Sequence, residues 1–364
     1  MKKSLTRPQK IQRLLIATDA WAPQVNGVVR TYERLVSELV QKNIDVYVVE
    51  PSQFKTIPLP GYSEIKLSLV LSNQINDLIL EKQPDHIHIA TEGPIGMAMR
   101  RYCMRHSLSF TTSFHTKFPE YIEARTMIPS HISYHLLRRF HNAATAVFVS
   151  TKSLMKTLEE KDFKNLKLWP KAVDTKIFRP KEINKQDFLH SVSTKHAQIN
   201  LHPKSPIFLY VGRVAIEKNI ESFLALNTKG LKVVVGEGPQ KNELERKFSE
   251  ALFVGQKTGE DLVDWYNAAD VFVFPSMTDT YGNVILEALA CGLPVAAYPV
   301  TGPIDIIDQG ITGYLSWDLD TAVQSSLKLK SDACMKAVSA NTWHYVSEKF
   351  LEILNSTRVH LTIH

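Results

Sequence analysis

The sequence has few of the residues that build disulfide frameworks or metal clusters. Its 364 residues contain only three cysteines, Cys103, Cys291 and Cys334, which are too far apart for a metal-ligand spacing. The motifs HExxH and GxSxG are absent as well. These absences argue against a dedicated metal site and against a serine nucleophile elbow, and they predict reduced thiols in a cytoplasmic protein.

Long hydrophobic runs are also missing. No segment approaches the ~20 apolar residues that cross a bilayer as a helix. The first apolar run, residues 14–17, is too short for the core of a signal peptide, and Asp19 follows it almost at once. We therefore interpret this run as a first strand, and we expect a cytoplasmic protein that is either free or peripheral on the cytoplasmic face of a membrane.

The bulk composition is that of a globular protein, with 44% apolar and 22% charged residues. The net charge of +6 is compatible with an anionic substrate, with an anionic membrane surface, or with solubility alone. Nucleic acid is not an expected partner, because the basic residues are scattered and no nucleic-acid-binding motif accompanies them.

Short apolar segments alternate with helical patterns along the chain, which predicts α/β domains with parallel sheets. The expected strands are 14–18, 46–49, 86–90, 110–113, 146–150 and 166–168, then 207–211, 232–235, 252–254, 271–274 and 294–297. The expected helices of the first half include 28–40, 67–80, 96–105 and 130–141.

Residues 180–206 are polar and lack a clear periodicity, so the chain is expected to divide there into two doubly wound, Rossmann-like domains. The predicted boundaries are a first domain at 1–182, a linker at 183–205, a second domain at 206–340, and a helix at 341–362 that packs back on the first domain. Ligands of such sheets bind beyond the carboxyl ends of the strands, and two facing domains would form one cleft.

Residues 276–287 (SMTDTYGNVILE) are the most informative segment. They follow an expected strand and contain a glycine turn that opens a helix, between Asp279 and Glu287. Backbone N–H groups and the positive end of the helix dipole at such a turn favour an anionic ligand. A carboxylate inside the helix can reach hydroxyl groups of the same ligand, so the pattern predicts a nucleotide or a nucleotide-sugar.

Two further loops of the second half carry compatible chemistry. Arg213 and Lys218 lie in the loop and helix start that follow strand 207–211. Two cations at a helix N-terminus are unfavourable unless an anion binds there, although solvated surface charge is an equal alternative. Gly236 and Gly238 form a tight loop after the next strand. Without a metal, these cations and N–H groups would stabilise a diphosphate.

In the first half, Gly27 stands at the entry to a helix and His115 stands just past the carboxyl end of a strand. The loop at Gly27 lacks the GxGxxG dinucleotide fingerprint. Close approach of its backbone to a phosphate or an acceptor is one interpretation, and a simple turn glycine is the other. For His115, a position at the substrate competes with a structural role.

These segments together resemble family 4 of the retaining glycosyltransferases with the GT-B fold, over nearly the whole chain from about residue 14 to residue 350. The most specific parts are 276–297, Arg213 with Lys218, and His115. Segments 22–31, 89–94, 114–119 and 298–305 are similar to a narrower branch. That branch includes bacterial α-mannosyltransferases that act on lipid acceptors and sulfoquinovosyl-diacylglycerol synthases.

The resemblance implies a role for each of these residues. Arg213 and Lys218 would bind and stabilise the leaving diphosphate, Glu287 would bind the ribose hydroxyls, and Asp279 would hold the donor sugar. Gly27 would approach the phosphate and His115 would lie at the sugar. The other implied donor-binding residues are Gly236, Gly238, Val254, Thr280, Tyr281, Gly282 and Asn283, and the implied acceptor-side residues are Asn26, Glu92 and Lys117.

The chain departs from the family pattern at three places. Asp279 replaces the usual Glu, Asn26 precedes Gly27 where two glycines are common, and Ala172 stands where Gly is common. The branch named above resembles this chain in using Asp at the position of Asp279. None of the three changes removes a charge that the implied mechanism needs.

The expected activity is metal-independent transfer of a hexose with retention, from GDP-mannose by preference or from a UDP-hexose, to a lipid or glycan acceptor. Basic residues in 100–106 and 130–141 make an anionic membrane surface a further possible partner. A UDP-sugar transferase acting on a soluble acceptor, a sugar-nucleotide epimerase and a non-catalytic nucleotide-sugar-binding protein are the alternatives. No acid–base partner beside His115 is evident for an epimerase.

Overall fold

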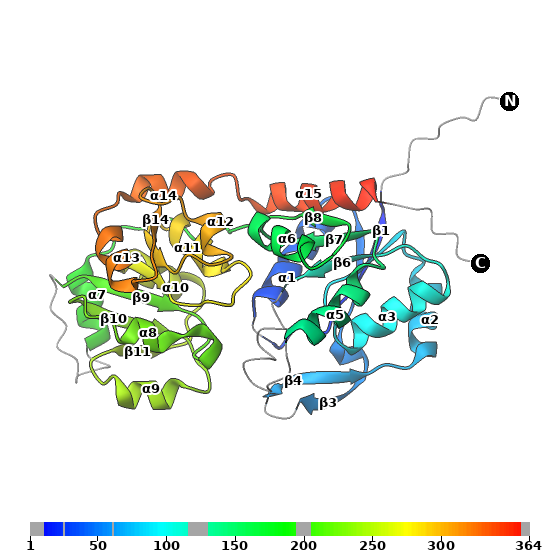
Figure 1. Cartoon of the computed structure of the whole chain (residues 1–364), viewed down its shortest axis with the longest axis horizontal. Helices are drawn as coiled ribbons and strands as arrows, with labels where there is room; N and C mark the ends of the chain where they lie inside the picture. The colour runs from blue at the N-terminus through cyan, green and yellow to red at the C-terminus, as the bar shows by residue number, and fades with distance from the viewer. Residues whose placement is uncertain (1–10, 25, 60–61, 116–129, 194–204, 358–364) are drawn as a thin grey trace. The chain divides into compact units, whose positions relative to one another are not determined.

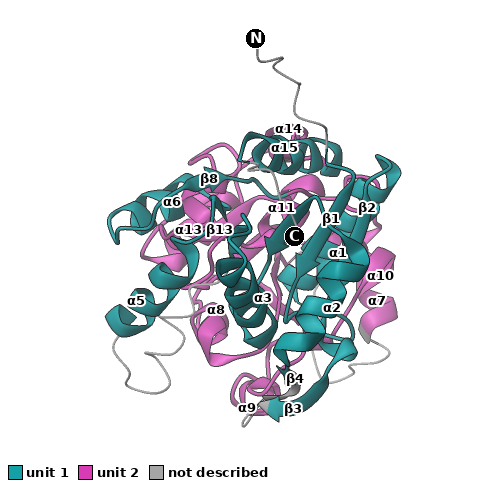
Figure 2. Ribbon diagram, turned by 90° about the vertical axis from the view of Figure 1, so that its right-hand side faces the viewer, with its two compact units in different colours: residues 1–171, 343–364 teal, residues 172–342 magenta. Residues whose placement is uncertain are grey.

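The computed structural model describes residues 11–24, 26–59, 62–115, 130–193 and 205–357. The chain forms two compact units, shown in different colours in Figure 2. The first unit contains Met1–Lys171 together with Trp343–His364, and the second contains Ala172–Thr342. The chain therefore crosses between the units twice.

The first unit is built on a six-stranded parallel sheet with the order β2-β1-β5-β6-β7-β8. Its strands are β1 (Arg13–Ala17), β2 (Asp45–Val49), β5 (His86–Ile89), β6 (Thr111–Phe114), β7 (Ala146–Val149) and β8 (Leu166–Leu168). Each expected strand of the first half is present to within one residue at either end. Leu15 pairs with both Tyr47 and Ile87, so the chain order reverses between β1 and β5. Ligands of doubly wound sheets bind at such a switch point.

Helices accompany this sheet, because strands such as β5, β6 and β7 are buried on both faces and need cover on both. The helices are α1 (Gly27–Gln41), α2 (Ser72–Lys82), α3 (Pro94–Arg105), α5 (Ser130–His141), α6 (Lys152–Glu159) and α15 (Trp343–Ser356), with a 3₁₀ turn η1 (Pro51–Gln53), as Figure 1 shows.

A β-hairpin of the first unit corrects one expectation. Strands β3 (Lys55–Leu59) and β4 (Tyr62–Leu69) pair antiparallel, and α2 begins only at Ser72. The predicted helix at 67–80 was therefore wrong over its first residues. Leu67, Val70 and Leu71 have the spacing of one helical face, which concealed the end of a strand.

The second unit has a six-stranded parallel sheet with the order β11-β10-β9-β12-β13-β14. Its strands are β9 (Ile207–Val211), β10 (Leu231–Val235), β11 (Leu252–Gly255), β12 (Val271–Phe274), β13 (Val295–Ala297) and β14 (Gly313–Leu315). The first five were expected, and β14 was not. The chain order reverses between β9 and β12, so the carboxyl ends of these two strands mark the switch point of this sheet.

The helices of the second unit are mostly short. They are α7 (Lys185–Ser193), α8 (Ile220–Leu224), α9 (Lys241–Lys247), α10 (Gly259–Ala268), α11 (Asn283–Ala290), α12 (Pro303–Ile306), α13 (Leu319–Ser326) and α14 (Ser331–Val338), with a 3₁₀ turn η2 (Ile216–Lys218) before α8. The η2 turn and α8 connect β9 to β10. Helix α11 follows β12, so its half-buried first turn lies at the carboxyl edge of the sheet.

The division of the chain differs from the expected boundaries at 182 and 183–205. The crossing lies between Lys171 and Ala172, and Val173 and Leu189 are buried in the core of the second unit. The Val173 N–H donates to the Asn341 carbonyl at 3.0 Å, which holds the outgoing and returning segments together. Residues 172–193 are thus part of the second unit, whereas 194–204 lie outside the described residues.

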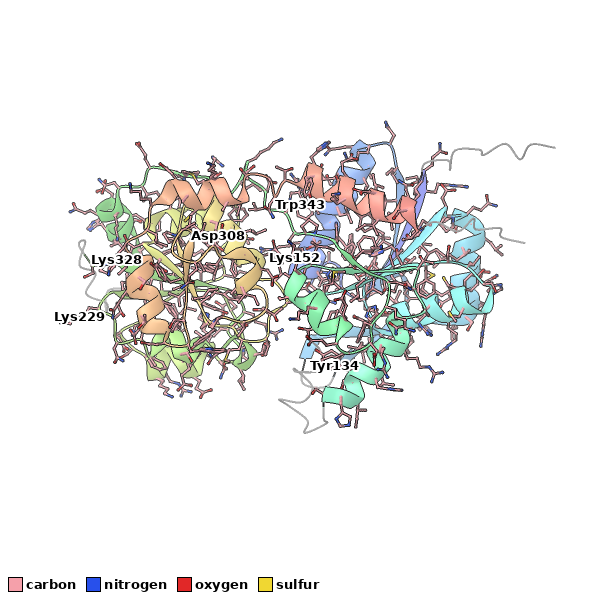
Figure 3. All side chains as sticks on the ribbon, turned by 45° about the horizontal axis from the view of Figure 1, so that its top comes forward. Tyr134, Lys152, Lys229, Asp308, Lys328 and Trp343 are labelled. Carbon is pink, nitrogen blue, oxygen red and sulfur yellow. The ribbon has the colours of Figure 1, made fainter. Side chains whose placement is uncertain are left out.

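The C-terminal helix expected at 341–362 corresponds to α15, which begins at Trp343, labelled in Figure 3, and belongs to the first unit. The Trp169 indole N–H donates to the Val346 carbonyl at 3.1 Å. Phe350 is fully buried against Trp169 and Phe148, with ring centroids 5.3 and 5.2 Å away. Helix α15 therefore completes the packing around Trp169 and Phe148 in the first unit.

The three cysteines are free and buried. Burial raises the pKa of Cys103 and Cys291 to about 12, so their thiols stay protonated at neutral pH. Among the described helices, none is long and apolar enough to span a membrane.

Candidate active site

The loop after β9 is tied to the segment after β12 by side chains from both. The Lys218 ammonium donates to Asp279 Oδ1 at 2.5 Å. The amide of Asn219 donates to the Pro275 carbonyl at 3.2 Å, and the Thr278 hydroxyl donates to the Glu217 carbonyl at 3.3 Å. The structure therefore brings together two of the predicted site residues, which are 61 positions apart in the sequence.

The Lys218–Asp279 ion pair changes the electrostatic argument made from the sequence. Lys218 ends the η2 turn, and its charge is met by a carboxylate of the protein. An anionic ligand is therefore not needed to relieve a conflict at the start of α8. Both side chains keep about a fifth of their surface exposed, at 22% and 18%, so a cation and an acceptor remain side by side and accessible.

Arg213 lies in the same loop and is half-buried. The Tyr210 hydroxyl donates to the Arg213 carbonyl at 2.9 Å, and the Tyr210 ring stacks on Phe223 of α8. Tyr210 is buried within β9, so this bond holds the backbone of Arg213 in place just beyond the end of the strand. Sequence reasoning did not single out Tyr210.

Gly236 and Gly238 allow two loops to pack backbone against backbone. A Cβ atom at Gly236 would lie 1.8 Å from the Gly212 carbonyl oxygen, and one at Gly238 would lie 2.3 Å from the Val214 carbonyl oxygen. The Val214 N–H also donates to the Glu237 carbonyl at 2.8 Å. These glycines thus have a packing role that sets the position of the Arg213 loop. Val254 lies on the next strand, β11, and packs against the core of the unit.

Gly282 is the N-cap of α11 and has a positive φ of 90°, a conformation that glycine adopts without strain. It offers no side-chain oxygen to cap the helix. The two residues before it, Thr280 and Tyr281, are buried, and Asn283 is the first helical residue. The first turn of α11 therefore has N–H groups that an anion or a hydroxyl oxygen can use.

Glu287 is a buried carboxylate in the middle of α11, with 8% of its surface exposed. The hydroxyl of Tyr266, on α10, donates to Glu287 Oε2 at 2.9 Å. Tyr266 is itself buried and packs against Phe272 and Phe178. A rigid donor thus orients one oxygen of the carboxylate. Tyr266 was missed from the sequence because its pairing partner lies 21 positions further along the chain, on another helix.

In the first unit, Asn26 and Gly27 begin α1. The Asn26 side-chain oxygen accepts hydrogen bonds from the Val28 and Val29 N–H groups, both at 3.0 Å. This is an N-cap, so the implied acceptor-side role of Asn26 competes with a structural one that occupies its oxygen. Gly27 is the first residue of the helix.

His115 follows β6, is half-buried, and belongs to a hydrogen-bonded network that continues to the buried side chains of Tyr32 and His88. Its Nε2 lies 3.0 Å from the Tyr32 hydroxyl, which lies 2.8 Å from His88 Nε2. Its Nδ1 lies 3.4 Å from the Lys171 ammonium. Burial lowers the pKa of His115 well below its ordinary value, and the charge of Lys171 lowers it further. His115 is therefore a neutral imidazole at neutral pH.

Glu92 and Asp19 occupy the same edge of the first sheet. Glu92 pairs with the buried His141 of α5 at 3.1 Å. Asp19 accepts hydrogen bonds from the Ile95 N–H at 2.8 Å and the Thr91 hydroxyl at 2.9 Å, which caps α3. Burial raises the pKa of Asp19 in spite of these bonds. Lys117, the remaining acceptor-side prediction, lies outside the described residues.

The predicted residues fall into two groups. Asn26, Gly27, Glu92 and His115 lie in the first unit, and those from Arg213 to Glu287 lie in the second. Within the part of the chain that the structure describes, no group of three potential metal ligands occurs.

Comparisons with known proteins decide the family. A family model for glycosyltransferase family 4 matches residues 25–177, and one for glycosyl transferases group 1 matches residues 205–332. Sulfoquinovosyl transferase SQD2 of Arabidopsis thaliana is 30% identical over 341 residues, with 86% of this chain and 64% of that protein covered. Both models describe glycosyltransferases and together they match most of the chain, so the chain is a glycosyltransferase of the kind that they describe. It spans just under two thirds of the length of the Arabidopsis relative.

Two other relatives of this glycosyltransferase cover more of their own length. The GDP-mannose-dependent alpha-mannosyltransferase of Corynebacterium glutamicum is 24% identical, with 94% of this chain and 86% of that protein covered. The alpha-monoglucosyldiacylglycerol synthase of Streptococcus pneumoniae is 23% identical, with 93% and 83% covered.

The fold agrees with this assignment. Sucrose-phosphate synthase of Thermosynechococcus elongatus superposes with a TM-score of 0.74 at 19% identity, over 95% of this chain and 98% of that chain. The glycosyltransferase thus has the GT-B architecture of two Rossmann-like domains that the sequence predicted.

Proposed function

We propose that this glycosyltransferase moves a hexose, mannose by preference, from a nucleoside diphosphate sugar to a lipid or glycolipid acceptor, with retention and without a metal ion. The observation that carries the proposal is the arrangement around 276–287. The Lys218 ammonium pairs with Asp279, which stands just before helix α11. The Glu287 carboxylate, which accepts a hydrogen bond from Tyr266, belongs to α11 itself. Phosphates, sugar hydroxyls and ribose hydroxyls each have a matching group in this arrangement.

In the proposed reaction, Arg213 and Lys218 stabilise the negative charge that develops on the leaving diphosphate. Asp279 and the N–H groups at the start of α11 hold the hydroxyls of the donor sugar, and Glu287 holds the ribose. The acceptor hydroxyl attacks the face from which the diphosphate leaves, and a phosphate oxygen takes its proton. The bond to the diphosphate breaks as the new glycosidic bond forms, so charges and atoms balance without a nucleophilic side chain.

Mannose and a lipid acceptor are proposed on the basis of two relatives. The Corynebacterium protein is described as GDP-mannose-dependent, and the Streptococcus protein is described as a glucosyldiacylglycerol synthase. UDP-hexoses remain alternative donors.

One titration tests the donor class. Thermal unfolding is followed with GDP-mannose, UDP-glucose, UDP-galactose, GDP and UDP, in the presence of EDTA. A ligand at a hundredfold excess over its Kd adds about 2.7 kcal/mol to the free energy of unfolding. We expect stabilisation by GDP-mannose and GDP, and anomeric NMR of the product should show retention. Stabilisation by none of the five, or a requirement for a divalent cation, contradicts the proposal.

The surface of α5 supports contact with an anionic membrane. Leu136 and Ile132 are exposed, at 60% and 47%, beside His131 and His135. Tyr134, labelled on α5 in Figure 3, packs under the Lys161 ammonium at 4.3 Å. A surface that combines apolar and cationic side chains in this way suits a lipid headgroup layer.

The contacts of the basic residues indicate which of them to substitute in a test of membrane binding. Arg100 donates to the carbonyls of Arg139 and Phe140, and Arg138 pairs with Asp162 at 3.0 Å, so both have structural bonds. Arg101 and Arg139 have exposed side chains. Flotation with liposomes of anionic lipid should weaken in Leu136→Ser and in the double variant Arg101→Gln/Arg139→Gln. Binding that survives all three substitutions contradicts membrane contact through α5 and the neighbouring part of α3.

A further inference from the structure

Lys171 is a buried lysine that neither the family comparison nor the proposed reaction uses. It lies three residues beyond the end of β8, and 7% of its surface is exposed. Its ammonium is 3.4 Å from His115 Nδ1 and 4.9 Å from the centre of the Trp169 ring. Because β6 and β8 flank β7 in a parallel sheet, the residues that follow them meet at one edge.

The other nitrogen of His115 is also within reach of a protein group. Nε2 lies 3.0 Å from the Tyr32 hydroxyl, and that hydroxyl donates to Ser113 Oγ at 2.9 Å. Tyr32 is fully buried, and burial raises its pKa, so it remains a phenol. The ring of His115 is therefore held between a lysine and a phenol.

The number of donors in this arrangement determines where the protons lie. An ammonium has only donors, and a neutral imidazole has one N–H and one bare nitrogen. With Lys171 charged, Nδ1 accepts, so Nε2 carries the proton and donates to the Tyr32 oxygen. We propose that Lys171 is a positioning residue of the glycosyltransferase, and that its ammonium fixes His115 in the Nε2–H tautomer.

The proposal rests on the proposed function only for its effect on catalysis, which requires that His115 lies at the donor sugar, as the family resemblance implies. A neutral Lys171 can accept a hydrogen bond from Nδ1–H; Nε2 would then accept from the Tyr32 hydroxyl, which would give up its bond to Ser113 Oγ. The tautomer of His115 is thus coupled to the charge of Lys171. Loss of that charge removes the constraint on the tautomer, because a neutral amine can donate or accept, and it leaves the ring less firmly held.

Several titratable groups face this pair. On the side of His115 they are His88 of β5 and His141 of α5, both of which disfavour a charged His115. Glu92 bonds to His141. Burial lowers the pKa of His88 well below its ordinary value, and it lowers the pKa of Lys171 to about 7. Lys171 is therefore the member of the pair whose charge changes near neutral pH.

The first measurement needs no substrate. The ¹⁵N shifts of the histidine rings report the tautomer, and the spectrum of His115→Gln identifies the His115 signals. At pH 6 we expect the Nε2–H form in the wild type and in Lys171→Arg, and a mixture of forms in Lys171→Met. Lys167→Met, an exposed position on β8, is the matched control and should leave the signals unchanged. A His115 tautomer that is the same in Lys171→Met and wild type overturns the proposal.

The second measurement separates positioning from binding. Lys171→Met should lower kcat about tenfold, the loss expected for one hydrogen bond to a charged group, and leave the donor KM unchanged. The wild-type kcat should fall as pH rises above 7, and in Lys171→Arg this fall should move to higher pH. A changed tautomer with an unchanged kcat overturns the catalytic role. Absence of transfer in every variant and the wild type refutes the proposed function instead, and the NMR result stands.

The variant Lys171→Arg distinguishes loss of the Lys171 charge from a failure to fold. If Lys171→Met fails to fold, Lys171→Arg still retains a charge and still predicts an alkaline shift in the pH profile. A folded Lys171→Arg protein with the wild-type pH profile overturns the proposal.

Discussion

Glu287 shows how one residue can be placed by a partner that the sequence pattern does not reveal. Its carboxylate is buried, and the Tyr266 hydroxyl supplies a hydrogen bond to one of its oxygens. A buried charge of this kind depends on each donor it has, because water cannot replace a lost one. The Tyr266 hydroxyl therefore helps to orient the Glu287 carboxylate.

Replacement of Tyr266 by Phe removes that hydrogen bond and retains the ring. We expect the Kd of the nucleoside diphosphate to rise about tenfold, since a hydrogen bond to a charged group contributes roughly 1.5–3 kcal/mol. If Glu287 binds ribose, the preference for the ribonucleotide over its 2′- and 3′-deoxy forms should shrink as well. Calorimetric titration measures both, with Tyr345→Phe, an exposed site, as control. An undiminished ribose preference in Tyr266→Phe would exclude this role.

The lowered pKa of Lys171 predicts that the free energy of unfolding depends on pH. Burial lowers its pKa to about 7 in the folded chain, whereas a lysine in an unfolded chain keeps a value near 10.5. Between these values the unfolded state binds more protons, so the free energy of unfolding rises with pH. The penalty for burying the charge is complete below pH 7 and is relieved above it.

The comparison with Lys171→Met isolates this effect. From pH 7 to pH 9 the wild type should gain roughly 2 kcal/mol relative to Lys171→Met. Hydrogen exchange of the first unit at the two pH values gives the two free energies. A difference between the variants that stays constant with pH would show that Lys171 titrates at its ordinary value.

At the scale of elements, the loops at the carboxyl edge of the second sheet depend on backbone contact. A Cβ at Gly236 would lie 1.8 Å from the Gly212 carbonyl oxygen, whereas one at Gly259 would have no atom within 4 Å. Both residues have a positive φ, 152° and 57°. A Cβ at either position would strain the backbone, but only a Cβ at Gly236 would also clash with another loop. Comparing the two substitutions therefore isolates the cost of the clash.

Gly236→Ala should destabilise the second unit by several kcal/mol, because the Gly212 loop must move, and it should weaken binding of the diphosphate at Arg213. Gly259→Ala should cost only about 1 kcal/mol, from the strained φ. Hydrogen exchange in β9 and β10 measures the loss for each variant. Equal losses would show that the loops adapt to a Cβ without cost.

The elements themselves were largely predictable, because their periodicities are local. Every expected strand formed, since runs such as 207–211 are apolar throughout and end at turn residues. The exceptions have local causes too. The end of β4 has helical spacing, and β14 is a three-residue strand, Gly313–Leu315, that is too short to show a periodicity and pairs with β13.

For the candidate site, the sequence offered residues but not the contacts between them. Position beyond a strand end singled out His115, Arg213 and Lys218 as candidates, and the helix start singled out Asp279. That Lys218 and Asp279 pair with each other could not be predicted, because the pairing joins two loops that only the sheet order brings together. Lys171 lies beyond the end of a strand, as His115 does, so the same criterion would have found it in the sequence.

At the scale of the whole molecule, the chain builds one unit, leaves it, builds a second, and returns to complete the first. The returning helix α15 supplies Phe350 and the Val346 carbonyl to the Trp169 side of the first sheet. The family models match residues 25–177 and 205–332, so α15 lies outside both matched ranges. Stability of the first unit thus depends on the last part of the chain.

Phe350→Ala tests this dependence. The substitution empties a fully buried site between Trp169, Phe148 and His88, which typically costs about 3–5 kcal/mol. Amides of β5–β8 should lose protection from hydrogen exchange by that amount, whereas amides of β9–β13 should keep theirs, because Phe350 contributes nothing to their core. Phe223→Ala, at a fully buried site of the second unit, should give the opposite distribution. Loss of protection in both sheets from either substitution would show that the two units unfold as one cooperative body, and α15 would then stabilise the whole enzyme.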